Sequence, residues 1–298
     1  MNVSGIFPAL TTPYHPDGSV ALDHCKADLA RYNKTGLAGY VVLGSTGESV
    51  LLSSAEADSL LAAGKEAAAP GKLLIAGTGA ESTAETIART KRAASLGYDI
   101  ALVKTPYYYK PAYNAETYLR HYRAVADASP IPVLLYSVPV FTGIALETPE
   151  IVALAQHPNI IGIKDSSGAI QRIVEVAAQA PKEFQILTGS AGVLYPALVS
   201  GATGAILALA SPLPEKCVEL FELFQSGQYA AAQNLQQHLA LASKVIVSEG
   251  GIAGVKHAMD LRGYHGGLPR LPLLPLADAK KAQIAQVLAQ FEPAAARA

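Results

Sequence analysis

Short stretches that are apolar from end to end recur along this chain, and amphipathic segments with helical periodicity separate them. Eight such stretches begin near residues 5, 39, 73, 99, 132, 160, 184 and 204. Unbroken apolar runs of this length are typical of strands that are buried on both faces of a parallel sheet. Their number, and their spacing of roughly 20–35 residues, predict an α/β chain folded as a (β/α)8 TIM barrel.

Residue types between these runs predict where the helices begin and end. Ser53 and Ser82 are each followed three residues later by a glutamate, which is the spacing of a capping box. Thr148 precedes Pro149, which predicts a capping residue followed by a proline at the first helical position. Glycines expected just beyond helix ends are Gly36, Gly97 and Gly201.

An open, doubly wound α/β sheet is the main alternative to a barrel. That fold commonly carries a Gly-x-Gly-x-x-Gly turn after its first strand, and no such motif follows the first apolar run here. The strands end near residue 210, and the remaining sequence is rich in Ala, Leu and Gln at helical spacing. We therefore predict additional C-terminal helices, and we divide the chain into a barrel, residues 1–224, and a helical extension, residues 225–298.

The composition narrows the class of partner. Half of the 298 residues are hydrophobic, 16% are charged and the net charge is −1, so the chain has no electrostatic attraction for nucleic acid or an anionic membrane. No apolar stretch approaches the ~20 residues that cross a bilayer, and the first residues do not resemble a secretion signal. We expect a small-molecule partner or a second copy of the chain, in the cytoplasm.

Neither the cysteines nor the histidines predict a disulfide or a metal site. Cys25 and Cys217 have dissimilar surroundings, and no Cys-x-x-Cys motif occurs. The seven histidines are scattered, with no set at metal-ligand spacing. These observations argue against a metal-dependent mechanism.

The second apolar run ends in the loop Gly44-Ser45-Thr46-Gly47-Glu48. A phosphate-binding Walker loop requires Gly-Lys-Ser/Thr at its end, whereas Glu48 would repel a phosphate. The loop is then either a tight strand-to-helix turn or a site for a carboxylate. In the second case, the Ser45 and Thr46 hydroxyls and nearby backbone N–H groups, such as that of Gly47, would bind a small organic acid at the catalytic end of the barrel.

Two lysines stand at the ends of apolar runs, Lys104 in IALVK and Lys164 in IIGIK. A lysine in this position often leaves the core for water. Alternatively, it is a Schiff-base nucleophile, because burial disfavours the ammonium form and a neutral amine can attack a ketone. Local sequence does not decide between the two lysines. Lys256, on a predicted helix, is a weaker candidate.

Tyrosines gather at the ends of two predicted strands. Tyr136 ends the fifth strand, next to the strand of Lys164, and could supply the proton shuttle that imine chemistry needs. Tyr107, Tyr108 and Tyr109 follow the fourth strand and could equally pack in a subunit contact. A hydroxyl chain from Tyr136 through Thr46 to Tyr108 would carry protons. Glu48 and Asp165 are expected to have structural roles.

Five motifs in this order, GSTGES, TPYYYKP, LLYSVP, GIKDSSG and GATGAI, resemble the dihydrodipicolinate synthase / N-acetylneuraminate lyase family over nearly the whole chain. The resemblance implies a class I aldolase on a (β/α)8 barrel, assembled as a homotetramer (a dimer of dimers) and requiring no cofactor. It assigns the Schiff base to Lys164 and acid/base work to Tyr136. It places Ser45 and Thr46 on the 2-oxo acid carboxylate and the hydroxyl relay.

The resemblance also implies that Tyr108 reaches a neighbouring subunit's site. It implies that Gly189 and Ser190 line the pocket and that the Ile206 carbonyl contacts the bound keto acid. Synthases of the family carry an arginine where this sequence has Phe141. Phenylalanine cannot pair with the carboxylate of an amino-acid-like second substrate, and loss of such a pair costs roughly 2–5 kcal/mol when it is desolvated.

The segments HPNIIGIKDSSG, LTGSAGVLYPAL and VKHAMDLRGYHGG are similar to the 4-hydroxy-2-oxoglutarate aldolase subgroup. That similarity implies cleavage of 4-hydroxy-2-oxoglutarate to pyruvate and glyoxylate. Dihydrodipicolinate synthesis from pyruvate and aspartate semialdehyde, and cleavage of a sugar-derived keto acid, are alternatives within the enzyme class. A keto-acid sensor that has lost turnover is an alternative outside it.

Overall fold

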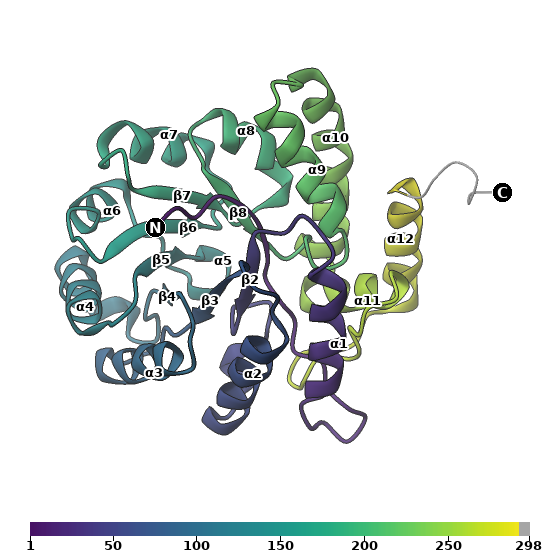
Figure 1. Ribbon diagram of the computed structural model, residues 1–298, viewed down its shortest axis with the longest axis horizontal. Helices are drawn as coiled ribbons and strands as arrows, with labels where there is room; N and C mark the ends of the chain where they lie inside the picture. Colours follow the sequence, from purple (N-terminus) through teal and green to yellow (C-terminus); the bar gives the residue numbers. More distant parts are fainter. Residues whose placement is uncertain (292–298) are drawn as a thin grey trace.

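The computed structural model describes residues 1–291, and eight parallel strands form its centre (Figure 1). The strands are β1 Gly5–Pro8, β2 Gly39–Val42, β3 Leu73–Gly77, β4 Ile100–Lys104, β5 Val133–Ser137, β6 Ile160–Asp165, β7 Gln185–Thr188 and β8 Gly204–Leu207. They are hydrogen-bonded in the order β1-β8-β7-β6-β5-β4-β3-β2. The Leu10 and Ala38 N–H groups, donating to Val41 and Ile6, join β1 to β2 and close the ring. The predicted TIM barrel is confirmed.

Helices surround the barrel and continue beyond it (Figure 1). Those between the strands are α1 Leu22–Tyr32, α2 Ser54–Ala67, α3 Thr83–Ser95, α4 Ala115–Ala128, α5 Pro139–Thr142, α6 Thr148–Leu154, α7 Ile170–Gln179 and α8 Leu194–Val199. Those after β8 are α9 Pro214–Gln225, α10 Tyr229–Ala242, α11 Gly251–Leu261 and α12 Asp278–Leu288. A π-helical turn, Ser243–Ser248, follows α10. In the part of the chain that the structure describes, no helix is long and apolar enough to span a membrane.

The apolar runs bury both faces of each strand, as their sequences predict. Inward-facing side chains such as Phe7, Leu102 and Leu134 fill the barrel. Outward-facing residues of the central strands, such as Val103 and Leu135, pack against α4, α6 and α7. Because inward and outward residues alternate, the last inward position of each strand lies at the C-terminal mouth.

The C-terminal helices share a hydrophobic cluster with the barrel. Leu194 and Leu198 of α8 belong to the same buried cluster as Leu239 of α10 and Met259 of α11. The predicted extension is therefore packed on the barrel. Its last residues, 292–298, lie outside the described part of the chain, and the predicted boundary at 224/225 falls within the last turn of α9.

Two of the predicted helix starts differ in detail. Ser53 forms the reciprocal capping box with Glu56. Ser82 accepts the Glu85 N–H, but the Glu85 carboxylate pairs with Arg89 one turn later, so only half of the box forms. Thr148 is the first residue of α6 rather than its cap, because its hydroxyl donates to Glu175 on the neighbouring helix α7.

Helices end near all three predicted glycines, although Gly36 has a different role. Gly97 and Gly201 have φ of 83° and 106°, the left-handed conformation that follows a helix end. Gly36 lies beyond α1, and a Cβ there would approach Val218 of α9 to 2.8 Å. Its small size permits close packing of the chain on α9.

Candidate active site

A cavity of about 380 Å³ lies at the C-terminal mouth of the barrel. It brings together most of the residues that the sequence singled out, from the ends of β2, β5, β6, β7 and β8. The predicted residues that line it are Ser45, Thr46, Tyr136, Lys164, Gly189, Ser190 and Ile206. Such a position, at the carboxyl ends of barrel strands, is where TIM-barrel enzymes carry their active sites.

Lys164 and Tyr136 face each other at this mouth. They are register partners on β6 and β5, so both side chains point into the barrel from the same level. The Lys164 Nζ lies 4.3 Å from the centre of the Tyr136 ring. The side chains are 4% and 5% exposed respectively, so the amine and the phenol are both largely shielded from bulk water. Desolvation of this kind is what a Schiff-base lysine requires.

The hydroxyl next to Tyr136 is that of Ser45. Their oxygen atoms are 3.3 Å apart, and either could be the donor. The sequence placed Thr46 at this point of the relay, whereas here Thr46 lines the cavity and Ser45 contacts the phenol. Adjacent residues of a tight turn point in different directions, and the backbone that sets those directions has no clear signature in the sequence.

The loop that carries these hydroxyls has an unusual backbone. Leu43 and Glu48 have φ of 61° and 55°, in the left-handed region that non-glycine residues seldom adopt. Gly47 lies against the segment that follows β1, where a Cβ would approach the Leu10 carbonyl to 2.9 Å, and its own carbonyl accepts the Thr12 hydroxyl at 2.6 Å. Gly47 thus supports the loop through close backbone packing. Strain of this kind persists only where the surroundings hold it in place.

The contacts of Glu48 fix this loop in place. Its carboxylate lies 2.7 Å from the Lys256 Nζ of α11, and both side chains are fully buried. The other carboxylate oxygen accepts the Arg270 N–H at 2.7 Å. Lys256 also donates to the Leu268 carbonyl, and burial lowers the pKa of this lysine, an effect that Glu48 opposes. The predicted structural role of Glu48 therefore takes the form of an ion pair that anchors the loop to the C-terminal helices.

Asp165 also has a structural arrangement. Its carboxylate accepts the Ser167 N–H at 2.7 Å and lies 3.7 Å from the Arg172 guanidinium. Its own carbonyl accepts the Gly189 N–H at 2.6 Å. A Cβ at Gly189 would lie 1.9 Å from the Ser166 hydroxyl, so only glycine fits there. These contacts set the path of the chain beyond Lys164 and shape one wall of the cavity.

The sequence did not single out several residues of this wall. Ser166 and Ser167 follow Asp165, two and three residues after Lys164, and the motif GIKDSSG contained them without an assigned role. Ser243 and Ser248 come from the π-helical turn after α10. Such turns occur often at functional sites, but no local residue pattern marks this one.

Tyr108, another predicted site residue, does not line this cavity. Its side chain is 72% exposed, and its ring packs edge-on to that of Tyr109, with ring centres 5.0 Å apart. Its N–H donates to Glu81. An exposed tyrosine is available to a second subunit, but no hydroxyl contact with Tyr136 is formed within the single chain.

Lys104, the competing lysine, occupies the neighbouring strand. It is the register partner of Tyr136 on β4, and its Nζ lies 3.3 Å from Glu81 and 4.6 Å from the centre of the Tyr107 ring. It lines a second cavity of about 230 Å³ that shares Ser45, Val138 and Phe141 with the first. Lys104 therefore belongs to the same mouth as Lys164 but has a carboxylate as its partner.

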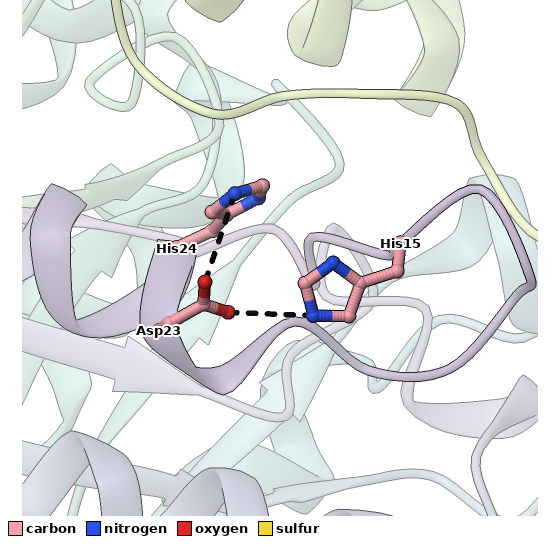
Figure 2. Close-up of side chains that lie close together, drawn as sticks. All are labelled: His15, Asp23 and His24. Atoms are coloured by element: carbon pink, nitrogen blue, oxygen red, sulfur yellow. Dashed lines mark ion pairs between the residues drawn. The ribbon is translucent and has the colours of Figure 1, made fainter.

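One group of potential metal ligands occurs in the described residues, away from the residues that line these cavities. Figure 2 shows Asp23 between His15 and His24, with carboxylate–imidazole distances of 3.4 Å and 3.9 Å. Asp23 lies in the first turn of α1, where the helix dipole disfavours a cation. All three side chains are substantially exposed, so we assign them a surface ion-pair role.

The comparisons with known proteins identify the family of this chain. A model of the dihydrodipicolinate synthetase family matches residues 2–291. A 4-hydroxy-tetrahydrodipicolinate synthase of Exiguobacterium is 35% identical over 288 residues, which cover 97% of this chain and 98% of that protein. A probable mitochondrial 4-hydroxy-2-oxoglutarate aldolase of Emericella nidulans is 36% identical over 294 residues, covering 97% and 94%.

Solved structures give the same result for the fold. A dihydrodipicolinate synthase of Bacillus anthracis superposes with a TM-score of 0.93 at 29% identity, covering 98% of this chain and 99% of that one. The barrel and the helices after it therefore have the same fold as that structure.

Proposed function

Because this chain belongs to the dihydrodipicolinate synthetase family of lyases, we propose that it cleaves 4-hydroxy-2-oxoglutarate to pyruvate and glyoxylate by class I aldolase chemistry. The observation that carries this proposal is the buried Lys164 amine, 4.3 Å from the Tyr136 ring, beside a hydroxyl-rich loop. The substrate would be a 2-oxo acid whose carboxylate is bound by Ser45, Thr46 and the backbone around Gly47.

The cleavage proceeds through an imine. The Lys164 amine adds to the C2 carbonyl and expels water, which leaves an iminium that withdraws electrons. Tyr136 gives its proton to the departing water as the iminium forms, and its oxygen then takes the proton of the C4 hydroxyl as the C3–C4 bond breaks and glyoxylate leaves. The remaining enamine is protonated at C3, and water then hydrolyses the imine to pyruvate and the free amine. Ser45, next to the phenol, passes the proton onward.

Phe141 favours the aldolase over the synthase. It lies on the short helix α5 at the mouth and lines both cavities, where an arginine would otherwise meet an amino-acid-like second substrate. An aromatic ring gives no charge-assisted contact to a carboxylate. Dihydrodipicolinate synthesis is the second candidate, and the names of most of the similar proteins favour it.

The proposal extends to assembly and compartment. The family likeness and the exposed Tyr108 support a homotetramer in which this side chain completes a neighbouring site. The two buried, unpaired cysteines, Cys25 and Cys217, are compatible with the reducing cytoplasm.

Pyruvate release from a panel of 4-hydroxy-2-oxo acids tests the reaction, and a coupled assay with pyruvate and aspartate semialdehyde tests the synthase. We expect turnover of 4-hydroxy-2-oxoglutarate, and borohydride with pyruvate should modify Lys164 irreversibly, as read by peptide mass spectrometry. Modification of Lys104 instead would overturn the assignment of the nucleophile. Efficient synthase turnover would overturn the argument from Phe141, and pyruvate binding without any turnover would indicate a sensor.

A further inference from the structure

We infer that Lys104 binds the second carboxylate of the substrate and thereby selects 2-oxo acids whose departing aldehyde is itself acidic. This inference rests on the proposed function, and it identifies a cation that the sequence alone did not provide. The starting point is the strand register. Lys104, Tyr136 and Lys164 are consecutive register partners on β4, β5 and β6.

Because the three residues are register partners, Lys104 and Lys164 lie on either side of the Tyr136 phenol. Ile100 and Leu102 of β4 point into the barrel, and strand side chains alternate, so Lys104 is the next inward position. Neighbouring strands are about 4.8 Å apart, which puts the Cα atoms of Lys104 and Lys164 about 10 Å apart across β5. A short carbon chain attached to Lys164 at C2 would extend past Tyr136 toward Lys104.

The cavities at the barrel mouth support a substrate that extends from Lys164 past Tyr136 toward Lys104. A small cavity lined by Ser45, Tyr136 and Lys104 adjoins the larger cavity of Lys164, with which it shares Ser45 and Tyr136. The 230 Å³ cavity continues it between Lys104 and Phe141. Among the described residues that line these three cavities, Lys104 and Lys164 are the only cationic side chains. If Lys164 is consumed in the imine, Lys104 is the cation left for an anionic group.

The Lys104 ammonium group has N–H donors beyond the one that contacts Glu81. An ammonium group carries three N–H donors, and the hydrogen bond that it makes in this structure goes to one Glu81 oxygen at 3.3 Å. The other Glu81 oxygen accepts the N–H groups of Tyr107 and Tyr108, at 3.0 and 2.8 Å, which holds that carboxylate at the loop after β4. Lys104 is 14% exposed, and the imidazole of nearby His121 is kept neutral because burial lowers its pKa to about 4. A substrate carboxylate would therefore meet one partly buried, incompletely satisfied cation.

The chemical consequence is a preference for dicarboxylic substrates. In 4-hydroxy-2-oxoglutarate, the C1 carboxylate and the C2 imine lie at Ser45 and Lys164, and the C5 carboxylate would pair with Lys104. After the C3–C4 bond breaks, the same contact would hold glyoxylate. A monocarboxylic analogue that ends in a methyl group would leave Lys104 paired with Glu81 alone.

A Lys104→Met variant tests the inference, because methionine keeps most of the side-chain volume and removes the charge. For 4-hydroxy-2-oxoglutarate, we expect kcat/KM to fall about 30-fold or more, as for a truncated, buried charge pair. For 4-hydroxy-2-oxopentanoate, which ends in a methyl group, we expect a change below about threefold. Lys104→Arg should restore part of the preference. Lys110→Met, at an exposed lysine in the same loop, should resemble the parent protein.

Three outcomes separate this inference from the proposed function. If the parent protein releases pyruvate from neither substrate, the proposed function fails first. If it cleaves the dicarboxylate and Lys104→Met retains the same preference, the inference about Lys104 is wrong. If Ser167→Ala loses the preference instead, the serines beside Lys164 bind the second carboxylate. Borohydride trapping of pyruvate on Lys164 reports whether each variant is folded and reactive.

Inhibition of pyruvate release in the parent protein tests the same contact without any variant. 2-Oxoglutarate and 2-oxopentanoate differ only in the terminal carboxylate. We expect 2-oxoglutarate to inhibit pyruvate release at concentrations at least tenfold lower, with a difference that shrinks as salt rises. Equal inhibition by the two acids would contradict a cationic contact at the far end of the site.

Discussion

At the scale of single residues, the mouth of the barrel depends on which hydroxyl touches Tyr136. The Ser45 hydroxyl lies 3.3 Å from the Tyr136 hydroxyl, and Thr46 lines the same cavity. The sequence analysis placed Thr46 in the hydroxyl chain, but the two residue types are chemically alike and adjacent, so the residue types alone do not distinguish them. Only the direction in which the loop backbone presents each side chain distinguishes them.

Replacing each hydroxyl separately checks this difference. Ser45→Ala removes the hydroxyl next to Tyr136, so if this hydroxyl passes protons to the phenol, kcat should fall by about 10²-fold, in the range of general acid–base contributions. Thr46→Val keeps the shape of the side chain and should act mainly through KM for the 2-oxo acid. Steady-state kinetics on both variants separates the two effects. A larger loss of kcat in Thr46→Val would return Thr46 to the relay.

At the scale of elements, α11 and the segment after it hold the loop that follows β2. The buried pair of Glu48 and Lys256 joins parts of the chain that are distant in sequence, at 2.7 Å. Removing one member of a buried pair leaves an uncompensated charge, which destabilises a protein by about 3–5 kcal/mol. Lys256→Met should therefore lower the free energy of unfolding, measured with urea, by about that amount, and should weaken pyruvate trapping because Ser45 loses its support.

The double variant Glu48→Gln with Lys256→Met gives the control. A neutral amide can still accept the Arg270 N–H, so much of the lost stability should return. A double variant that is as unstable as the sum of the two single variants would mean that the ion pair does not couple the loop to α11.

The packing of α3 on α4 has its own pH dependence. His121 of α4 contacts the Thr83 hydroxyl at 2.9 Å, and burial lowers its pKa from 6.5 to about 4. Between pH 6.5 and 4 the unfolded chain binds a proton that the folded chain does not, so stability falls as the pH is lowered through this window. The loss for one such group is on the order of 3 kcal/mol.

Urea unfolding at several pH values measures that slope. In His121→Gln, which cannot titrate, the part of the slope due to this histidine should disappear between pH 6.5 and 4. Burial raises the pKa of Asp28 despite its contact with His265, so this carboxyl gives a slope of the opposite sign, and it is the same in the variant and the parent protein. An identical slope in the variant and the parent protein would show that His121 is not buried as a neutral group.

The elements themselves were largely predictable, and particular residues show why. Runs such as IALVK and NIIGIK are apolar because both faces of their strands are buried. A single sequence is enough to reveal this local pattern. The register that sets Lys104, Tyr136 and Lys164 at one level is a property of the closed barrel, and no single run contains it. Likewise, the partner of Glu48 and the serines of the π-helical turn come from distant segments, so only the folded chain identifies them.

At the scale of the whole molecule, a single chain leaves an apolar surface uncovered beside its own active site. The exposed side chains there follow β4 and β5, which are neighbours in the sheet, and include Tyr108, Tyr109, Val140 and Phe141, each at least 60% exposed. Aromatic residues grouped on an exposed face are typical of protein–protein interfaces. The assembly is expected to cover part of this surface and to bring Tyr108 to a neighbouring site.

Light scattering with size-exclusion chromatography should give a mass four times that of one chain. Tyr109→Arg places a charge in the expected contact and should shift the protein to smaller species. Tyr108→Phe should keep the tetramer, because only a hydroxyl is lost, yet lower kcat if that hydroxyl serves a neighbour's Tyr136. A tetramer with unchanged kcat in Tyr108→Phe would exclude the shared relay. A monodisperse single chain with full activity would show that each barrel mouth is complete without its neighbours.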